Sequence, residues 1–160
     1  MIIILMGSNL GDRVKFFLEA EKRITHDIGR ILIKSSIYET QPWGFDHKNE
    51  FLNQVVGLES EFPPDKVLDA LLTIENQMGR KREEGGYTTR NIDLDLLFYD
   101  SFIINTTKLI LPHPRLHLRK FTLVPLNEIF PTLVHPVLNM SISQILKNCS
   151  DPLRVRKFKP

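Results

Sequence analysis

Two acidic residues, Asp93 and Asp95, are the strongest candidates for chemistry in this sequence. Residues two apart in a β-strand project from the same face, so a strand here would hold both carboxylates side by side. Such a pair suits a bound cation, and oxygen ligands are those that Mg²⁺ prefers. The alternative is a solvated strand face, because Asp-x-Asp is a short motif. The apolar residues of the segment are expected to pack against the opposite face: Ile92, Leu94, Leu96 and Phe98.

A basic segment, 80–90, comes directly before this acidic pair. Clustered guanidinium groups suit bidentate recognition of phosphate. The segment has no periodicity and contains Gly85 and Gly86, so we expect it to close over bound substrates. The alternative is a solvated charged loop, but the neighbouring carboxylates favour a metal–nucleotide site. The basic residues of the segment are Arg80, Lys81, Arg82 and Arg90.

A possible site for a flat heterocycle lies earlier in the chain. Phe51 and Asn53 are two residues apart and would share a strand face, with Trp43 and Gly44 a short distance upstream. An aromatic ring beside a fixed amide can stack on a heterocycle and also read its edge by hydrogen bonds. Phe51 taken alone fits a hydrophobic core better.

Two histidines, His113 and His117, are four residues apart and could share a helical face as zinc ligands. The sequence offers no third ligand at a suitable spacing. Arg115 and Arg119 alternate with them, so a phosphate contact by His113 fits its surroundings better than zinc does.

Strands and helices must both position these residues. Hydrophobic patterning predicts strands at 2–6, 31–37, 51–58 and 91–99, and helices at 12–28, 63–78 and 141–147. Residues 7–12 match neither the Walker nor the Rossmann phosphate-binding pattern, so a tight turn and a helix N-cap are their expected roles. The elements do not alternate as in a doubly wound parallel sheet, which favours an α+β fold.

Composition narrows the class of protein. The 160 residues predict one domain, 1–160, with a basic tail from about residue 151. The 21 basic and 19 acidic residues give a net charge of +2, too small for general attraction to nucleic acid or acidic membranes. Cys149 is the only cysteine, which excludes an internal disulfide. The apolar run 2–6 is far shorter than the ~20 residues of a spanning helix, so we expect a cytoplasmic protein.

Several short motifs follow one another along the chain, at residues 7–11, 38–44, 51–53, 75–82, 90–95, 111–115 and 125–129. In this order and spacing they resemble the 6-hydroxymethyl-7,8-dihydropterin pyrophosphokinase family of folate biosynthesis. The resemblance covers about residues 2 to 147, and the ordered set is far more specific than any one motif.

The resemblance implies a ferredoxin-like α+β sandwich with a central antiparallel sheet flanked by helices. It also implies transfer of pyrophosphate from ATP to the pterin hydroxymethyl group, with release of AMP. Asp93 and Asp95 would hold two Mg²⁺ ions. The partners would be small molecules, a reduced pterin and ATP, and the protein would be a monomer that binds neither nucleic acid nor membrane.

The resemblance also implies roles for further residues. Those expected to neutralise charge on the phosphates are Arg82, Arg90, His113 and Arg119. Those expected at the pterin are Phe51 and Phe121 as a sandwich, Asn53 at its edge, and backbone groups of Thr40 and Trp43. Those expected at the nucleotide are Glu75, Arg80, Arg82, Tyr87, Arg90, His113 and Arg119.

Three positions depart from the family pattern. Tyr87 stands where members often carry Trp, Glu83 where a Lys can occur, and Pro114 where a Tyr can follow the His. Tyr87 keeps an aromatic side chain, whereas Glu83 removes a positive charge near ATP.

The rival interpretation is a nucleic-acid-binding module, since ferredoxin-like sheets also present aromatic and basic faces to RNA. The small net charge, the lack of an RNP-type motif and an Asp pair that would repel phosphate without metal all count against it. A catalytically dead scaffold is disfavoured because the Asp pair and the arginines are intact.

Overall fold

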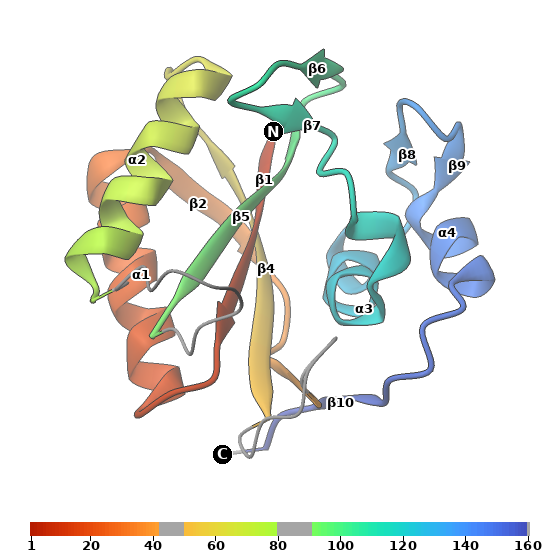
Figure 1. The fold of residues 1–160 in the computed structure, drawn as a ribbon, viewed down its shortest axis with the longest axis horizontal. Helices are drawn as coiled ribbons and strands as arrows, with labels where there is room; N and C mark the ends of the chain where they lie inside the picture. Colours follow the sequence, from red (N-terminus) through yellow and green to blue (C-terminus); the bar gives the residue numbers. More distant parts are fainter. Residues whose placement is uncertain (42–49, 80–90, 160) are drawn as a thin grey trace.

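The computed structural model describes residues 1–41, 50–79 and 91–159, which fold around one six-stranded antiparallel sheet (Figure 1). Its strands are β1 (Ile2–Ser8), β2 (Arg30–Lys34), β3 (Tyr38–Thr40), β4 (Phe51–Glu59), β5 (Asp93–Tyr99) and β10 (Val155–Lys157). Their order is β10-β3-β4-β1-β5. β2 pairs with the later part of β4, after the part that pairs with β3. Two hairpins lie outside this sheet: β6 (Ile104–Asn105) with β7 (Ile110–Leu111), and β8 (Val134–His135) with β9 (Met140–Ser141).

Helices cover both faces of the sheet (Figure 1). α1 (Arg13–Asp27) and α2 (Pro64–Gln77) lie on one face, and α3 (Lys120–Ile129) and α4 (Ile142–Asn148) lie on the other. A 3-10 turn, η1 (Leu116–Leu118), leads into α3. No helix in the described ranges is long and apolar enough to cross a membrane.

β1 is buried along its whole length because it contributes to the cores on both faces. Ile2, Ile4 and Met6 pack with residues of α1 and α2, whereas Ile3 and Leu5 pack with residues of α3 and α4. A strand buried on both faces needs an uninterrupted apolar run rather than an alternating pattern. The prediction of a central strand at the N-terminus is confirmed.

Most predicted elements are present, with capping that explains their ends. α1 begins after Asp12, whose side chain accepts a hydrogen bond of 3.1 Å from the Lys15 N–H. α2 begins with Pro64, where the missing N–H costs no helical hydrogen bond. α4 begins after Ser141, which forms a reciprocal capping box with Gln144.

The strand predicted at 31–37 ends early, at Lys34. The Ser35 N–H still donates to the Val55 carbonyl at 2.9 Å, but the Val55 N–H donates to the Ser35 hydroxyl at 3.0 Å. A side chain thus replaces the backbone acceptor, which is how serine competes with regular strand pairing. The chain resumes pairing with β4 at Tyr38, as β3.

The placement of Phe98 on the same face as Leu94 and Leu96 was wrong. Ile3 pairs with Phe98 and Ile4 pairs with Leu96, so β5 carries an extra residue, Leu97, at a β-bulge. The bulge reverses the alternation, and Phe98 joins the core beneath α3 and α4. Asp93 and Asp95 precede the bulge and keep their common face.

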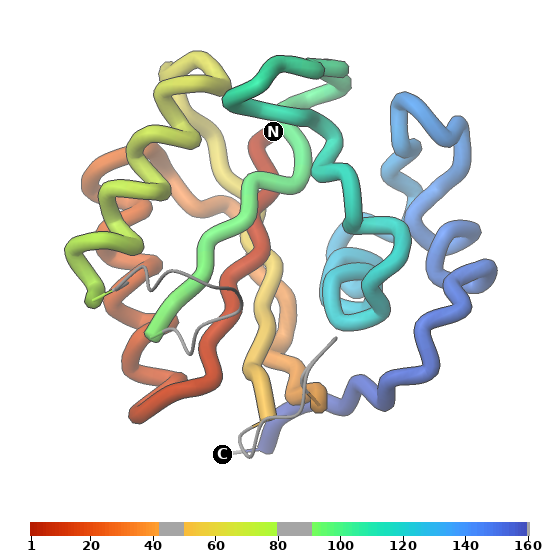
Figure 2. Tube along the Cα trace, viewed as in Figure 1, coloured from red at the N-terminus to blue at the C-terminus, as the bar shows by residue number. Residues whose placement is uncertain are grey.

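α3 and β10 are among the elements that were not predicted. α3 carries Pro125 inside the helix, and the basic tail forms β10, which pairs with β3 through residues 155–157. Figure 2 shows the C-terminal segment crossing beneath α3 to reach this edge of the sheet. The tail is therefore part of the fold.

Candidate active site

The candidate active site lies on the face of the sheet that α3 covers only in part. Two cross-strand rows run over this face from β4 through β1 to β5. One row contains Asn53, Gly7 and Asp93, and the neighbouring row ends at Asp95. Directly paired residues of an antiparallel sheet share a face, so both aspartates and the Asn53 amide lie on one surface. The common face of the two aspartates was predicted; its continuation to Asn53 was not.

Gly7 is a residue whose role the sequence analysis missed. It lies within β1 rather than in the expected turn, between Asn53 and Asp93. A Cβ there would lie 3.4 Å from the Asn53 Oδ1 and 4.0 Å from the Asp93 Cβ. Because glycine has no side chain, the sheet surface between the Asn53 amide and the Asp93 carboxylate stays open. A glycine at the end of an apolar strand run was the available signal.

The Asp95 carboxylate faces a basic group from the other layer. Its Oδ2 lies 4.0 Å from Nη1 of Arg119, whose side chain is 13% exposed. Arg119 precedes α3 and also lies over the ring of Phe121, with 5.6 Å between its guanidinium carbon and the ring centroid. α3 thus brings a cation and an aromatic ring to the strand that carries the carboxylates.

The carboxylate pair fits a divalent cation in its chemistry. Mg²⁺ is commonly held by one or two carboxylates, with substrate phosphates and water completing its shell. Asp93 and Asp95 supply that number of groups from one strand. Within the described ranges, no cluster of three or more His, Cys, Asp or Glu gathers as in an all-protein metal site.

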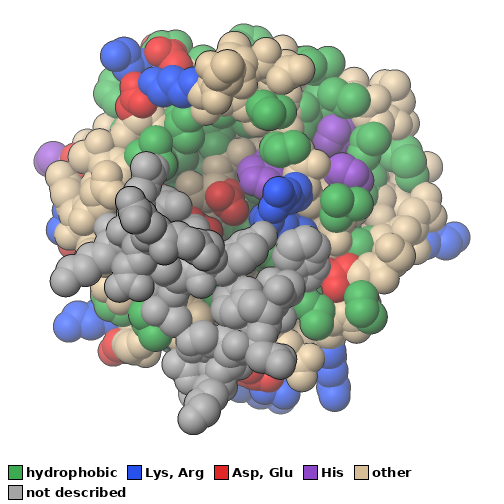
Figure 3. Space-filling model, in the orientation of Figure 1, with side chains coloured by type: hydrophobic (Ala, Val, Ile, Leu, Met, Phe, Trp, Pro, Cys, Tyr) green, Lys and Arg blue, Asp and Glu red, His purple; other side chains and the backbone are tan. Residues whose placement is uncertain are grey.

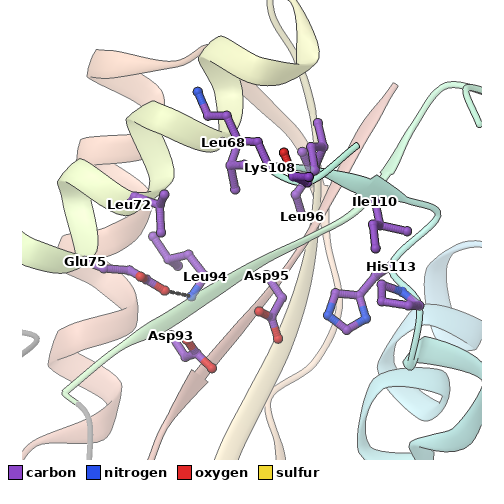
Figure 4. Close-up of a pocket in the computed structure, with 13 residues that line it drawn as sticks. Leu68, Leu72, Glu75, Asp93, Leu94, Asp95, Leu96, Lys108, Ile110 and His113 are labelled. Atoms are coloured by element: carbon purple, nitrogen blue, oxygen red, sulfur yellow. Dashed lines mark hydrogen bonds between the residues drawn. The ribbon is translucent and has the colours of Figure 1, made fainter. Parts of the chain in front are cut away.

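Glu75 reaches β5 from α2 on the opposite face of the sheet. Its side chain is 1% exposed, and Oε1 accepts a 2.7 Å hydrogen bond from the Leu94 N–H (Figure 4). Leu94 lies between the two aspartates, so this bond fixes the backbone from which both carboxylates project. Glu75 thereby holds Asp93 and Asp95 in position from the opposite face of the sheet.

His113 is held as a neutral ring. Its backbone N–H donates to the carbonyl of the bulged residue Leu97 at 2.9 Å, and its Nδ1 accepts from the Arg115 N–H at 3.2 Å. Burial, aided by the nearby Arg119 and Arg115, lowers the pKa of His113 to about 4. An acceptor at Nδ1 places the proton on Nε2, so the ring offers an N–H donor at neutral pH.

A cavity of about 350 Å³ opens between α2, β5 and the β6–β7 hairpin (Figure 4). About half of its lining residues are apolar, and its polar residues come from α2, from β5, from the β6–β7 connection and from the segment after β7. Figure 3 shows acidic, histidine and basic side chains gathered around a hollow on this face. The principal lining residues are Leu68, Leu72, Leu96, Ile110, Asp93, Asp95 and His113.

Of the residues expected at the pterin, Thr40, Phe51 and Asn53 lie on the same sheet face, toward β3. Asn53 and Thr40 are buried, and the Asn53 Nδ2 donates to the Thr40 Oγ1 at 3.0 Å. Phe51 pairs with Thr40 across β3 and β4 and is half-buried, and Phe121 is half-buried in the first turn of α3. The predictions for Trp43, Arg80, Arg82, Tyr87 and Arg90 concern residues outside the described ranges.

Comparison with known proteins shows the family of this chain. A sequence model of the 7,8-dihydro-6-hydroxymethylpterin-pyrophosphokinase (HPPK) family matches residues 3–131. The chain belongs to the HPPK family. It is 38% identical over 139 residues to a 2-amino-4-hydroxy-6-hydroxymethyldihydropteridine pyrophosphokinase of Porphyromonas gingivalis, covering 85% of this chain and 94% of that protein.

Other HPPK relatives are much longer. The folic acid synthesis protein fol1 of Pneumocystis carinii is 38% identical over 152 residues, which cover 94% of this chain but only 20% of that protein. The structure of Plasmodium falciparum HPPK-DHPS with pteroate covers 92% of this chain and 44% of its own, with a TM-score of 0.72 and 15% identity. That likeness confirms the expected fold, an antiparallel sheet flanked by helices.

Proposed function

We propose that this chain catalyses the reaction after which its family is named, the transfer of pyrophosphate from ATP to 6-hydroxymethyl-7,8-dihydropterin. The observation that carries the proposal is the row Asn53–Gly7–Asp93. It sets a heterocycle-reading amide and a carboxylate pair on one open face, roughly 10 Å apart at two strand spacings of about 4.8 Å. That span suits a bicyclic ring whose substituent points toward the reacting phosphates.

ATP is proposed to enter through the cavity beside α2. The apolar side chains of Leu68, Leu72 and Ile110 would contact its base, and the triphosphate would extend toward His113 and Arg119. Neutral His113 would donate its Nε2–H to a phosphate oxygen. Arg119 would neutralise charge that develops on the β-phosphate and on the departing AMP. Arg80, Arg82, Tyr87 and Arg90 are proposed as further nucleotide contacts.

Asp93 and Asp95 are proposed to hold two Mg²⁺ ions. Bound there, the ions would supply charge neutralisation to the triphosphate and would favour ionisation of the pterin hydroxyl. Glu75 fixes the backbone between the two carboxylates, and Arg119 faces Asp95. These contacts orient the ligand oxygens before any substrate arrives.

The pterin is proposed to lie between Phe51 and Phe121. Asn53, together with backbone groups of Thr40 and Trp43, would read its edge. The hydroxymethyl oxygen would attack the β-phosphorus while the bond from that phosphorus to the α,β-bridging oxygen breaks. AMP leaves, and the pyrophosphoryl group remains on the pterin.

The test is incubation of the protein with ATP, Mg²⁺ and 6-hydroxymethyl-7,8-dihydropterin, with nucleotide products separated by chromatography. AMP should accumulate only when the pterin and Mg²⁺ are both present. ADP as the main product would contradict pyrophosphoryl transfer. Tight RNA binding without turnover would instead favour the nucleic-acid-binding alternative.

A further inference from the structure

The basic C-terminal tail forms an outer strand beside β3. In β10, Val155 pairs with Thr40, Arg156 with Glu39 and Lys157 with Tyr38. β3 has only three residues, so it gains few hydrogen bonds from β4 alone. Thr40 consequently lies between two strands, with Phe51 on one side and Val155 on the other.

Arg156 connects β10 to Glu39 in β3 and to Glu50, which directly precedes β4. Its Nη2 lies 3.0 Å from the Glu39 Oε2 and 2.7 Å from the Glu50 Oε2. Arg13, at the start of α1, donates to the Glu39 Oε1 at 3.3 Å and to the Glu50 carbonyl at 2.7 Å. Burial opposes ionisation of Glu39, but hydrogen bonds from Arg156 and Arg13 hold its pKa below the usual value.

Lys157 makes the matching connection on the other face of the sheet. Its Nζ lies 3.0 Å from the Glu128 Oε1 in α3 and 5.9 Å from the centre of the Tyr38 ring. Glu128 also accepts hydrogen bonds of 2.7 Å from the Ser36 N–H and from the Ser36 hydroxyl. Arg156 therefore ties β10 to Glu39 and Glu50, which also bind Arg13 of α1, and Lys157 ties β10 to α3 on the other face.

The position of β3 determines the direction of the Asn53 amide. Thr40 Oγ1 accepts the hydrogen bond from Asn53 Nδ2, which fixes which way the amide oxygen points. That oxygen borders the open sheet surface at Gly7. A small displacement of Thr40 would therefore turn the group that is proposed to read the pterin.

We propose that β10 positions the pterin-reading pair Thr40 and Asn53, with Arg156 and Lys157 as positioning residues. This inference rests on the proposed function and deepens it, because it gives the basic tail a role in pterin recognition. Exposed ion pairs contribute little to folding, so the effect should appear in substrate binding rather than in overall stability. Misplacing a binding group by a fraction of an ångström is sufficient to weaken recognition.

The test compares Arg156→Ala, Arg156→Lys and Lys157→Ala in the full chain, and measures kcat, both KM values and the melting temperature. Arg156→Ala should raise KM for the pterin about tenfold and leave KM for ATP within about twofold. Arg156→Lys should be intermediate, because one ammonium cannot bridge Glu39 and Glu50 with the planar geometry of a guanidinium. Lys157→Ala should act in the same direction.

Lys159→Ala is the matched control, because it removes an exposed positive charge just beyond β10. It should leave both KM values unchanged. An unchanged pterin KM in Arg156→Ala, or equal losses for both substrates with a lower melting temperature, would overturn the inference. If Arg156→Ala fails to fold, Lys157→Ala against Lys157→Arg decides the question by the same KM comparison. A wild type that forms no AMP would instead refute the proposed function.

Discussion

The two faces of the central sheet differ in how evenly they are covered. On the α1/α2 face, residues from β1, β4 and β5 form a continuous apolar core that includes Ile4, Leu52 and Leu94. On the α3/α4 face, the apolar core includes Leu5 and Phe98 but does not extend over the whole face. The rest of that face carries the Asp pair, Asn53 and Thr40.

Under the proposed function, one strand serves stability with one set of residues and chemistry with the other. In β5, Leu94 packs into the core, whereas its neighbours Asp93 and Asp95 face the site. Glu75 links the two functions, because a buried carboxylate from the packed face fixes the backbone of the strand. Substitutions on the two faces should therefore separate activity from folding.

The largest effect is expected from Asp95→Ala and Asp93→Ala. Each should lower turnover at saturating Mg²⁺ by at least about 10³-fold, because the proposed metal site would lose a ligand. The free energy of unfolding should change by less than about 1 kcal/mol, since removal of one of two neighbouring carboxylates relieves repulsion. Steady-state AMP formation and urea denaturation measure the two quantities.

Asp27→Ala is the control for these variants, because Asp27 is an exposed residue at the end of α1, away from the site. It should retain full activity. Near-normal turnover in either site variant would remove that aspartate from the proposed metal site.

Leu94→Ala tests the opposite face of the same strand. The side chain is 4% exposed and packs in the core beneath α1 and α2. Its truncation should cost about 2 to 5 kcal/mol of unfolding free energy. Turnover per folded molecule should fall far less than in Asp95→Ala. A stability loss below 1 kcal/mol, or a loss of activity as large as that of Asp95→Ala, would contradict the separation of the two faces.

The sequence was sufficient to predict that side chains of β5 alternate between the two sheet faces before the bulge, but it did not predict the bulge itself. The period of two placed Asp93 and Asp95 together and opposite Leu94. Residues 96–98 are all apolar, so nothing in their pattern marks Leu97 as the extra residue. The bulge also turns the Leu97 carbonyl toward the His113 N–H, a contact between segments that local patterning does not encode.

The elements near the C-terminus were the hardest to predict. Pro125 normally argues against a helix, because it has no N–H for the Phe121 carbonyl. α3 is nevertheless stable, because Leu123 and Leu126 are fully buried against the sheet. β10 owes its structure to pairing with β3 and to ion pairs with distant residues, so its local sequence reads only as a basic tail.

A smaller effect, and one that depends on pH, is expected at His113. Its folded-state pKa of about 4 lies below the ordinary value of 6.5, so the unfolded chain binds a proton more readily between these pH values. The contribution of His113 to stability should therefore be fully present above pH 6.5 and decline by up to about 3 kcal/mol as the pH falls to 4, at about 1.4 kcal/mol per pKa unit.

Denaturation of the wild type and of His113→Gln across this pH range measures that contribution. The difference between the two free energies of unfolding should change with pH between 6.5 and 4 and stay constant above 6.5. Parallel curves over the whole range would show that His113 titrates alike in the folded and unfolded chain. The neutral donor proposed for the triphosphate would then lose its support.

The smallest effect is expected from Phe51→Ala. This variant tests whether Phe51 belongs to the polar or to the packed part of the α3/α4 face. Phe51 is half-buried at the edge of the polar part, beside Thr40, where an aromatic ring can either stack on the pterin or pack the sheet. If it stacks, truncation should weaken pterin binding by roughly 1 to 3 kcal/mol, the range found for bases on aromatic side chains. ATP affinity should change less, because the cavity beside α2 does not include Phe51.

Phe102→Ala removes a ring that is 49% exposed and stacks on Tyr99 instead, so it serves as the control and should leave both affinities unchanged. Calorimetric titration with each ligand distinguishes these cases, and an unchanged pterin affinity in folded Phe51→Ala would assign Phe51 to the core.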